Sequence, residues 1–132
     1  MLDAGVLVAI LNRDDLHHAA AVAAVSSARD RRDELVVPVS AYAEAHVSPS
    51  RTGVGAIRIY DSLVDRLPAR VEPATRSIGA AAAELRARFG PALRLPDALV
   101  IATAQVLRAD RIVTTDQSWP VIDVPVEIVG GP

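Results

Sequence analysis

The chain has 132 residues, of which 51% are hydrophobic and 23% charged, and its formal net charge is −2. These values exclude a disordered tail and predict one globular domain spanning residues 1–132. The absence of cysteine excludes disulfides and thiolate metal sites. No apolar run reaches the roughly 20 residues of a membrane span, and no signal peptide opens the chain, so we expect a cytoplasmic protein. The net charge neither excludes a nucleic-acid partner nor argues for one.

The N-terminal third predicts a strand followed by two helices and a second strand. A short strand opens the chain, and residues 6–11 then carry apolar side chains at helical spacing. A second helix is expected from about residue 17 to residue 29, with Asp15 as its N-cap. Residues 35–37 are typical of a buried strand.

The middle of the chain predicts two helices separated by a loop. Ser40 is expected to cap a helix that carries Glu44 and ends before Pro49. Residues 48–55 contain the clearest loop pattern of the chain. Residues 56–67 are amphipathic, and this helix is compatible with a groove for a partner, with a dimer interface, or with packing on the domain's own core.

The C-terminal half continues the alternation. A brief strand is expected near residue 71, then helices over about 73–89 and 96–108, a strand over 111–115 and a last strand over 126–129. Strands that alternate with helices are typical of βαβ units. The sequence therefore predicts an α/β fold in which helices cover both faces of a small, mostly parallel sheet.

Four carboxylates lie where predicted strands end or helices begin. Asp3 follows the first hydrophobic residues, Glu44 follows the strand at 35–37, Asp97 opens an apolar helix, and Asp116 ends a β-branched strand. In an open parallel sheet, these positions lie at one edge, beyond the carboxyl ends of the strands. We therefore expect the four side chains to converge.

Such a cluster favours a cation. Two carboxylates about 5 Å apart repel by roughly 3 kcal/mol at an effective dielectric constant of 20. A divalent ion reverses the sign of this interaction, and Mg²⁺ or Mn²⁺ prefers oxygen ligands. We therefore predict a metal site that supports hydrolysis of phosphodiester bonds.

The same segments resemble the four acidic motifs of PIN-domain nucleases, and in size and order the chain resembles bacterial VapC-type toxins. The stretch from Pro96 to Ala104 carries the most specific part of this resemblance. The segments that match are Leu2–Leu7, Ser40–Glu44, Leu95–Ala104 and Val113–Asp116.

The resemblance implies a three-layer α/β/α sandwich with Mg²⁺- or Mn²⁺-dependent endoribonuclease activity. It implies that Asp3, Glu44, Asp97 and Asp116 are the metal-binding and catalytic residues. It also implies an RNA substrate, a cognate antitoxin protein and a homodimer.

The sequence departs from this pattern at two places. Gly5 stands where the family often has Ser or Thr, and only Met1 and Leu2 precede Asp3, where the family usually has a longer strand. The missing hydroxyl favours an alternative hypothesis: a catalytically weak or inactive PIN-like module that binds RNA or protein.

Other polar residues are candidates with weaker support. Arg13, Arg51, Arg58 and Arg94 are candidates for phosphate contacts, although an arginine taken singly is more often a solvated surface residue. Thr114 and Thr115 precede Asp116, and one of them is a candidate to orient it, although simple β propensity explains both. For the three histidines, His17, His18 and His46, we expect structural or surface roles.

Overall fold

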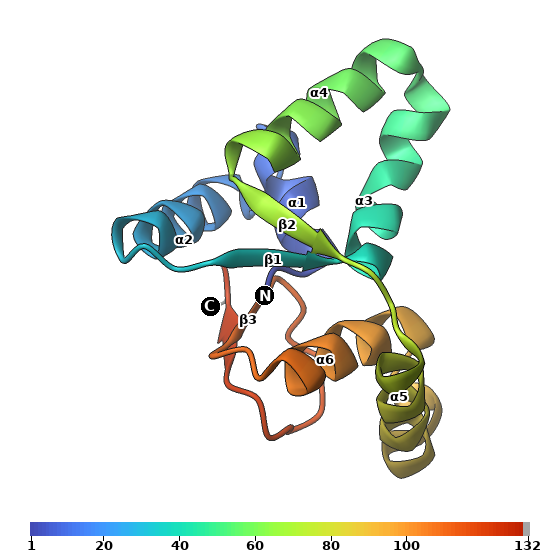
Figure 1. Cartoon of the computed structure of the whole chain (residues 1–132). Helices are drawn as coiled ribbons and strands as arrows, with labels where there is room; N and C mark the ends of the chain where they lie inside the picture. The colour runs from blue at the N-terminus through green and yellow to red at the C-terminus, as the bar shows by residue number, and fades with distance from the viewer. Residues whose placement is uncertain (131–132) are drawn as a thin grey trace.

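The computed structural model describes residues 1–130, and Figure 1 shows how its helices surround a small sheet. The strands are β1 (Leu35–Pro38), β2 (Ala69–Glu72), β3 (Ile112–Thr114) and β4 (Val126–Ile128). The helices are α1 (Ala4–Leu11), α2 (His18–Asp30), α3 (Val39–Thr52), α4 (Val54–Arg66), α5 (Arg76–Phe89), the 3-10 turn η1 (Gly90–Ala92) and α6 (Leu95–Leu107). Within this described part of the chain, no helix combines the length and the apolar character needed to cross a bilayer.

Residues 1–3 join two pairs of parallel strands. β1 pairs with β2, and β3 pairs with β4. Between these pairs, the Leu2 N–H donates to the Val36 carbonyl at 2.8 Å, and the Val113 N–H donates to the Met1 carbonyl at 2.8 Å. The expected opening strand is thus a single bridge between Leu2 and Val113. Since all these segments run parallel, Asp3 emerges at the edge where β1 and β3 end.

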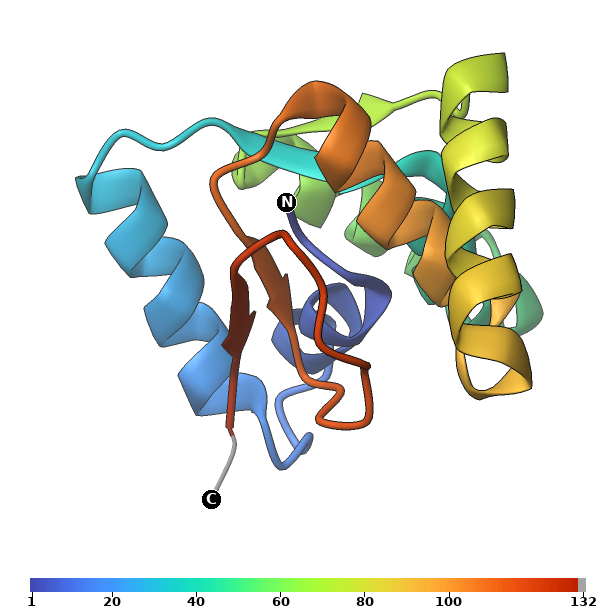
Figure 2. The ribbon, with the colours of Figure 1, turned by 90° about the horizontal axis from the view of Figure 1, so that it is seen from below.

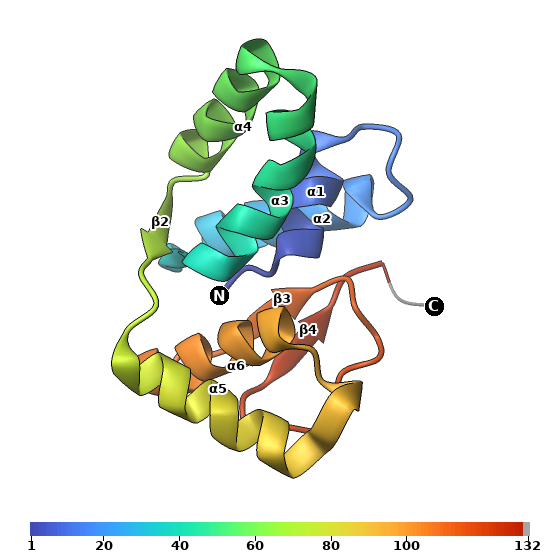
Figure 3. The same ribbon diagram turned by 90° about the vertical axis from the view of Figure 1, so that its right-hand side faces the viewer.

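Helices cover both faces of the sheet, as predicted. In Figure 3, α5 and α6 lie on one side of β3 and β4, and α1, α2 and α3 lie on the other. Figure 2 shows the same separation from below, with α2 along β4 and α6 across the sheet from it. Side chains from all three layers are almost fully buried; they include Leu2, Leu7, Val37, Ile78, Ile101 and Ile112. The three-layer α/β/α prediction is confirmed.

The predicted loop at residues 48–55 was wrong. Helix α3 begins at Val39, continues through Pro49 and ends at Thr52. Pro49 is buried, so packing overrides the usual preference of proline to end a helix. Ser40 lies in the first turn instead of capping it, and its hydroxyl is buried without a hydrogen-bond partner among the described residues. The chain reverses at Gly53, whose φ of 133° favours glycine.

Helices α3 and α4 form a hairpin that projects from the sheet (Figure 1). Tyr60 of α4 is fully buried and donates its hydroxyl to the Tyr42 carbonyl at 2.9 Å. The Tyr42 hydroxyl in turn donates to Asp61 at 2.6 Å, which raises the pKa of Tyr42 to about 12. The apolar face of residues 56–67 therefore packs within the domain, while Ile59 on the same helix is 64% exposed.

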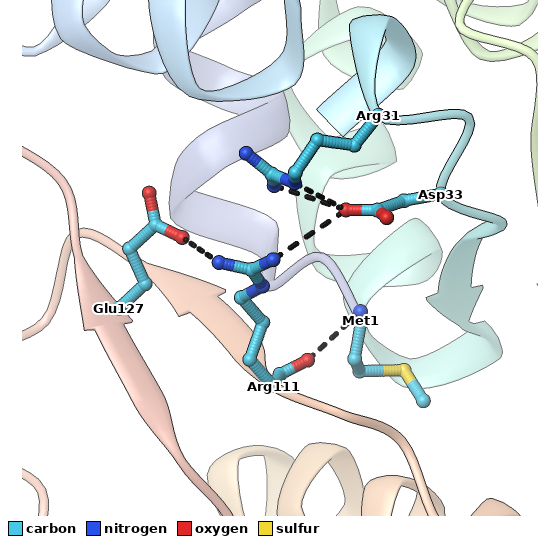
Figure 4. Close-up of polar contacts among 5 residues, drawn as sticks. All are labelled: Met1, Arg31, Asp33, Arg111 and Glu127. Atoms are coloured by element: carbon cyan, nitrogen blue, oxygen red, sulfur yellow. Dashed lines mark hydrogen bonds and ion pairs between the residues drawn. The ribbon is translucent and has the colours of Figure 1, made fainter. Parts of the chain in front are cut away.

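At the amino ends of the strands, acidic and basic groups pair with one another (Figure 4). Arg111 lies 3.5 Å from Asp33 and 3.4 Å from Glu127, and Arg31 lies 2.9 Å from Asp33. The Met1 ammonium donates to the Arg111 carbonyl at 3.1 Å, and burial is the main cause that lowers the pKa of this amine. This edge is charge-balanced, in contrast to the opposite edge.

Candidate active site

Asp3 is a buried carboxylate at the start of α1. It is the N-cap of the helix and only 5% exposed. Its Oδ1 accepts the Ala4 N–H at 2.8 Å, and its Oδ2 accepts the Thr114 hydroxyl at 2.7 Å. Burial raises the pKa of Asp3, these two hydrogen bonds lower it, and the charges of Asp97 and Asp116 raise it further.

Asp97 is buried in the first turn of α6. Pro96 precedes it within that turn and suits the first residues of a helix, which lack N–H partners. The Arg94 Nε donates to Asp97 Oδ2 at 3.3 Å. Burial is the main cause that raises the pKa of Asp97; Arg94 lowers this pKa and Asp116 raises it.

Glu44 and Asp116 complete the set. Glu44 lies half-buried on α3, and its carboxylate makes no hydrogen bond to another described residue. Burial raises the pKa of Glu44, and the charges of Asp3 and Asp97 raise it further. Asp116 follows β3, and its Oδ1 accepts both the N–H and the hydroxyl of Ser118, at 2.8 and 2.6 Å.

The structure brings the four predicted acids into one electrostatic cluster. Asp3 interacts with the other three carboxylates, and Asp97 does so as well. Coulomb interactions fall with distance, so these mutual effects place the four groups near one another at the carboxyl edge of the sheet. One basic side chain, Arg94, lowers the pKa of two of them.

The four carboxylates are chemically suited to a hard divalent cation, but their side chains are not oriented to bind one. Among residues 1–130, no three His, Cys, Asp or Glu side chains are placed to hold a metal ion as they stand. Three of the acids are turned toward local partners, namely Ala4 and Thr114 for Asp3, Arg94 for Asp97 and Ser118 for Asp116. Clustered carboxylates fit Mg²⁺ or Mn²⁺, and binding would require their side chains to rotate.

Thr114 links two of the acids. It is fully buried, its hydroxyl donates to Asp3, and the same oxygen accepts the Asp116 backbone N–H at 3.0 Å. The sequence marked Thr114 or Thr115 as a candidate to orient Asp116. In the structure, Thr114 anchors the backbone of Asp116 and the carboxylate of Asp3 together.

Trp119 is a neighbour of the site that was not among the candidate residues chosen from the sequence. Its indole nitrogen is buried, and this N–H lowers the pKa of Asp97, although it makes no hydrogen bond of ordinary geometry. With Asp116, it also lines an open groove of about 270 Å³ whose other walls include Val121 and Ile122. The feature of the sequence that could have pointed to this residue is that the chain's single tryptophan lies three residues after Asp116.

Of the candidate phosphate-binding arginines, Arg94 lies at the acids, with its side chain 69% exposed. Arg13 is exposed in the turn that follows α1, at the opposite end of this helix from Asp3. Arg51 is exposed in the last turn of α3, roughly 10 Å along the helix axis from Glu44. Phosphate contacts by Arg13, Arg51 and Arg58 stay predictions.

The family model for the PIN domain matches residues 1–125, which is nearly the whole chain. No curated protein matches the chain. PIN domains are generally metal-dependent nucleases, so the match indicates nuclease activity. The chain belongs to the PIN domain family.

Proposed function

We propose that this protein is a toxin-type endoribonuclease that hydrolyses RNA phosphodiester bonds and that residues 1–132 form one nuclease domain. The observation that carries the proposal is the convergence of Asp3, Glu44, Asp97 and Asp116, which come from distant parts of the chain; within this cluster, neighbouring carboxylates raise the pKa values of Asp3, Glu44 and Asp97. An RNA substrate would place the protein in the cytoplasm, in agreement with the expectation from the sequence.

In this proposal, the four carboxylates would hold Mg²⁺ or Mn²⁺, and a cation bound there would stabilise the charge that develops on the phosphodiester. Thr114 keeps Asp3 in place by donating a hydrogen bond to it. Arg94 is exposed enough to exchange its contact with Asp97 for one with a phosphate oxygen. The residues at the site bind and orient the substrate, and no side chain is needed as a nucleophile.

The decisive variant is Asp97→Asn, which keeps the size and hydrogen-bonding shape of the side chain but removes its charge. We expect it to abolish Mn²⁺-dependent cleavage of single-stranded RNA while the protein remains folded by circular dichroism. The matched control is Asp65→Asn, because Asp65 is an exposed carboxylate on α4. Full cleavage by Asp97→Asn would show that the reaction occurs elsewhere.

The alternative function, a module that binds RNA or protein without cleaving it, predicts a different calorimetric result. Titration of the wild type with Mn²⁺ should give saturable binding if the acids form a metal site. Absence of binding at millimolar Mn²⁺ would favour the alternative. The carboxylates' present orientation makes this titration informative, because they must turn from their local partners to meet a cation.

A cognate antitoxin and a homodimer are further parts of the proposal, and both derive from the likeness to VapC-type toxins. The hairpin of α3 and α4 offers surface of suitable character, since Val54 and Ile59 are 65% and 64% exposed. Light scattering after gel filtration should give a mass near twice 13.9 kDa if the dimer forms. A monomer at micromolar concentration would contradict the dimer but not the nuclease.

A further inference from the structure

Gly5 and Thr115 occupy one shared space beside the acidic site. Gly5 lies in the first turn of α1, two residues after Asp3, and Thr115 lies between β3 and Asp116. A Cβ placed on Gly5 would overlap with the Thr115 Oγ1 and would lie 3.4 Å from the Thr115 Cβ. The Thr115 hydroxyl therefore fills the volume that any side chain at position 5 would need.

The Thr115 hydroxyl also lacks a hydrogen-bond partner among the described residues. Its neighbour Thr114 is engaged on both sides, with Asp3 and with the Asp116 N–H. Thr115 is half-buried, and its Oγ1 makes no hydrogen bond to any residue from Met1 to Gly130. A hydroxyl held against the start of α1, next in sequence to Asp116, can donate a hydrogen bond once the carboxylates turn toward a cation.

We propose that Thr115 is a positioning residue of the acidic site and that Gly5 is the space that admits it. When the carboxylates at the start of α1 and the end of β3 turn toward a cation, the Thr115 hydroxyl would donate a hydrogen bond to one of them and keep it in its metal-binding orientation. The inference rests on the proposed metal-dependent function. Under this proposal, Gly5 does not mark the loss of a hydroxyl from the site, because Thr115 supplies a hydroxyl from the opposite side of the same gap.

The first test compares Thr115→Val with Thr115→Ser. Valine keeps the branched shape and removes the hydroxyl, whereas serine keeps the hydroxyl. We expect Thr115→Val to weaken Mn²⁺ binding by roughly 10- to 100-fold, which is typical when a residue that orients metal ligands is lost. Thr115→Ser should recover most of this affinity. Calorimetry measures the binding, and the fluorescence of Trp119, the only tryptophan, gives an independent signal close to the site.

The second test moves the hydroxyl across the gap. Gly5→Ser alone should lower the melting temperature, because its side chain collides with Thr115. The double variant Gly5→Ser with Thr115→Ala removes the collision and supplies a hydroxyl from α1. The double variant Gly5→Ala with Thr115→Ala is the matched control, since it fills the same space without a hydroxyl. We expect both double variants to melt above Gly5→Ser and the serine version to bind Mn²⁺ at least tenfold more tightly than the alanine version.

Each outcome separates the inference from the function on which it rests. A wild type that binds Mn²⁺ and cleaves RNA, with Thr115→Val within twofold of it in both, overturns the role of Thr115 alone. Equal Mn²⁺ affinity of the two double variants overturns it as well. A wild type that neither binds Mn²⁺ nor cleaves RNA refutes the proposed function and the inference together.

Discussion

Asp97→Asn should stabilise the metal-free protein at neutral pH, although it removes a charge from a favourable helix position. Asp97 is 7% exposed and lies among other carboxylates. Two carboxylates about 6 Å apart repel by roughly 3 kcal/mol at an effective dielectric constant of 20. Against this, a negative charge in the first turn of a helix contributes about 0.3–1 kcal/mol. The contact with the exposed Arg94 contributes at most about 1 kcal/mol.

The balance favours the neutral variant by about 1–2 kcal/mol, which corresponds to a rise of roughly 3–8 °C in melting temperature for a domain of this size. Millimolar Mn²⁺ should make the wild type melt above Asp97→Asn. A ligand at 100 times its dissociation constant stabilises the folded protein that binds it by about 2.7 kcal/mol. The assay is thermal unfolding of both proteins at pH 7.5, with EDTA and with Mn²⁺.

The stability of Asp97→Asn relative to the wild type should also depend on pH. The folded-state pKa of Asp97 is raised, so the wild type loses stability as the pH rises through this pKa and regains it as the pH falls. The advantage of Asp97→Asn in EDTA should therefore shrink from pH 7.5 toward pH 4. If Asp97→Asn instead melts below the wild type in EDTA, and Mn²⁺ shifts the melting temperature of neither protein, Asp97 is a helix-capping residue and the electrostatic reasoning fails.

Three further predictions follow from individual contacts. Thr114→Val removes the donor to Asp3 and should weaken Mn²⁺ binding by roughly tenfold or more in calorimetry; unchanged affinity would show that this hydrogen bond does not orient the site. As the pH is lowered from neutral, the Mn²⁺ affinity of the wild type should fall before the usual carboxyl range is reached, because burial and neighbouring charges raise the pKa values of Asp3 and Asp97; an affinity that falls only within the usual range would contradict those raised values. Tyr60→Phe leaves the Tyr42 carbonyl without its donor and should lower the free energy of unfolding by about 1 kcal/mol in urea, with Mn²⁺ affinity unchanged; a change in Mn²⁺ affinity would mean that the α3–α4 hairpin is coupled to the site.

Much of the fold was accessible from the sequence because its signals are local. Apolar spacing predicted α1, α5 and α6 closely, and the β-branched segment at 111–115 predicted β3. The boundary of α3 was wrong, because Pro49 suggested a helix end by its local chemistry. Only the packing of a buried proline inside the α3–α4 hairpin could overrule it.

The sequence by itself determined which acids to consider, since each follows a strand or opens a helix and parallel strands direct such positions to one edge. Tertiary structure alone decided the partners of those acids. The hydrogen bond between Thr114 and Asp3 joins residues 111 positions apart, and Trp119 reaches Asp97 from a loop beyond β3. Tertiary structure also explains the glycine at position 5, because Thr115 occupies the space that a side chain there would need. Contacts between distant segments depend on how the layers pack, and no local pattern of residues encodes that packing.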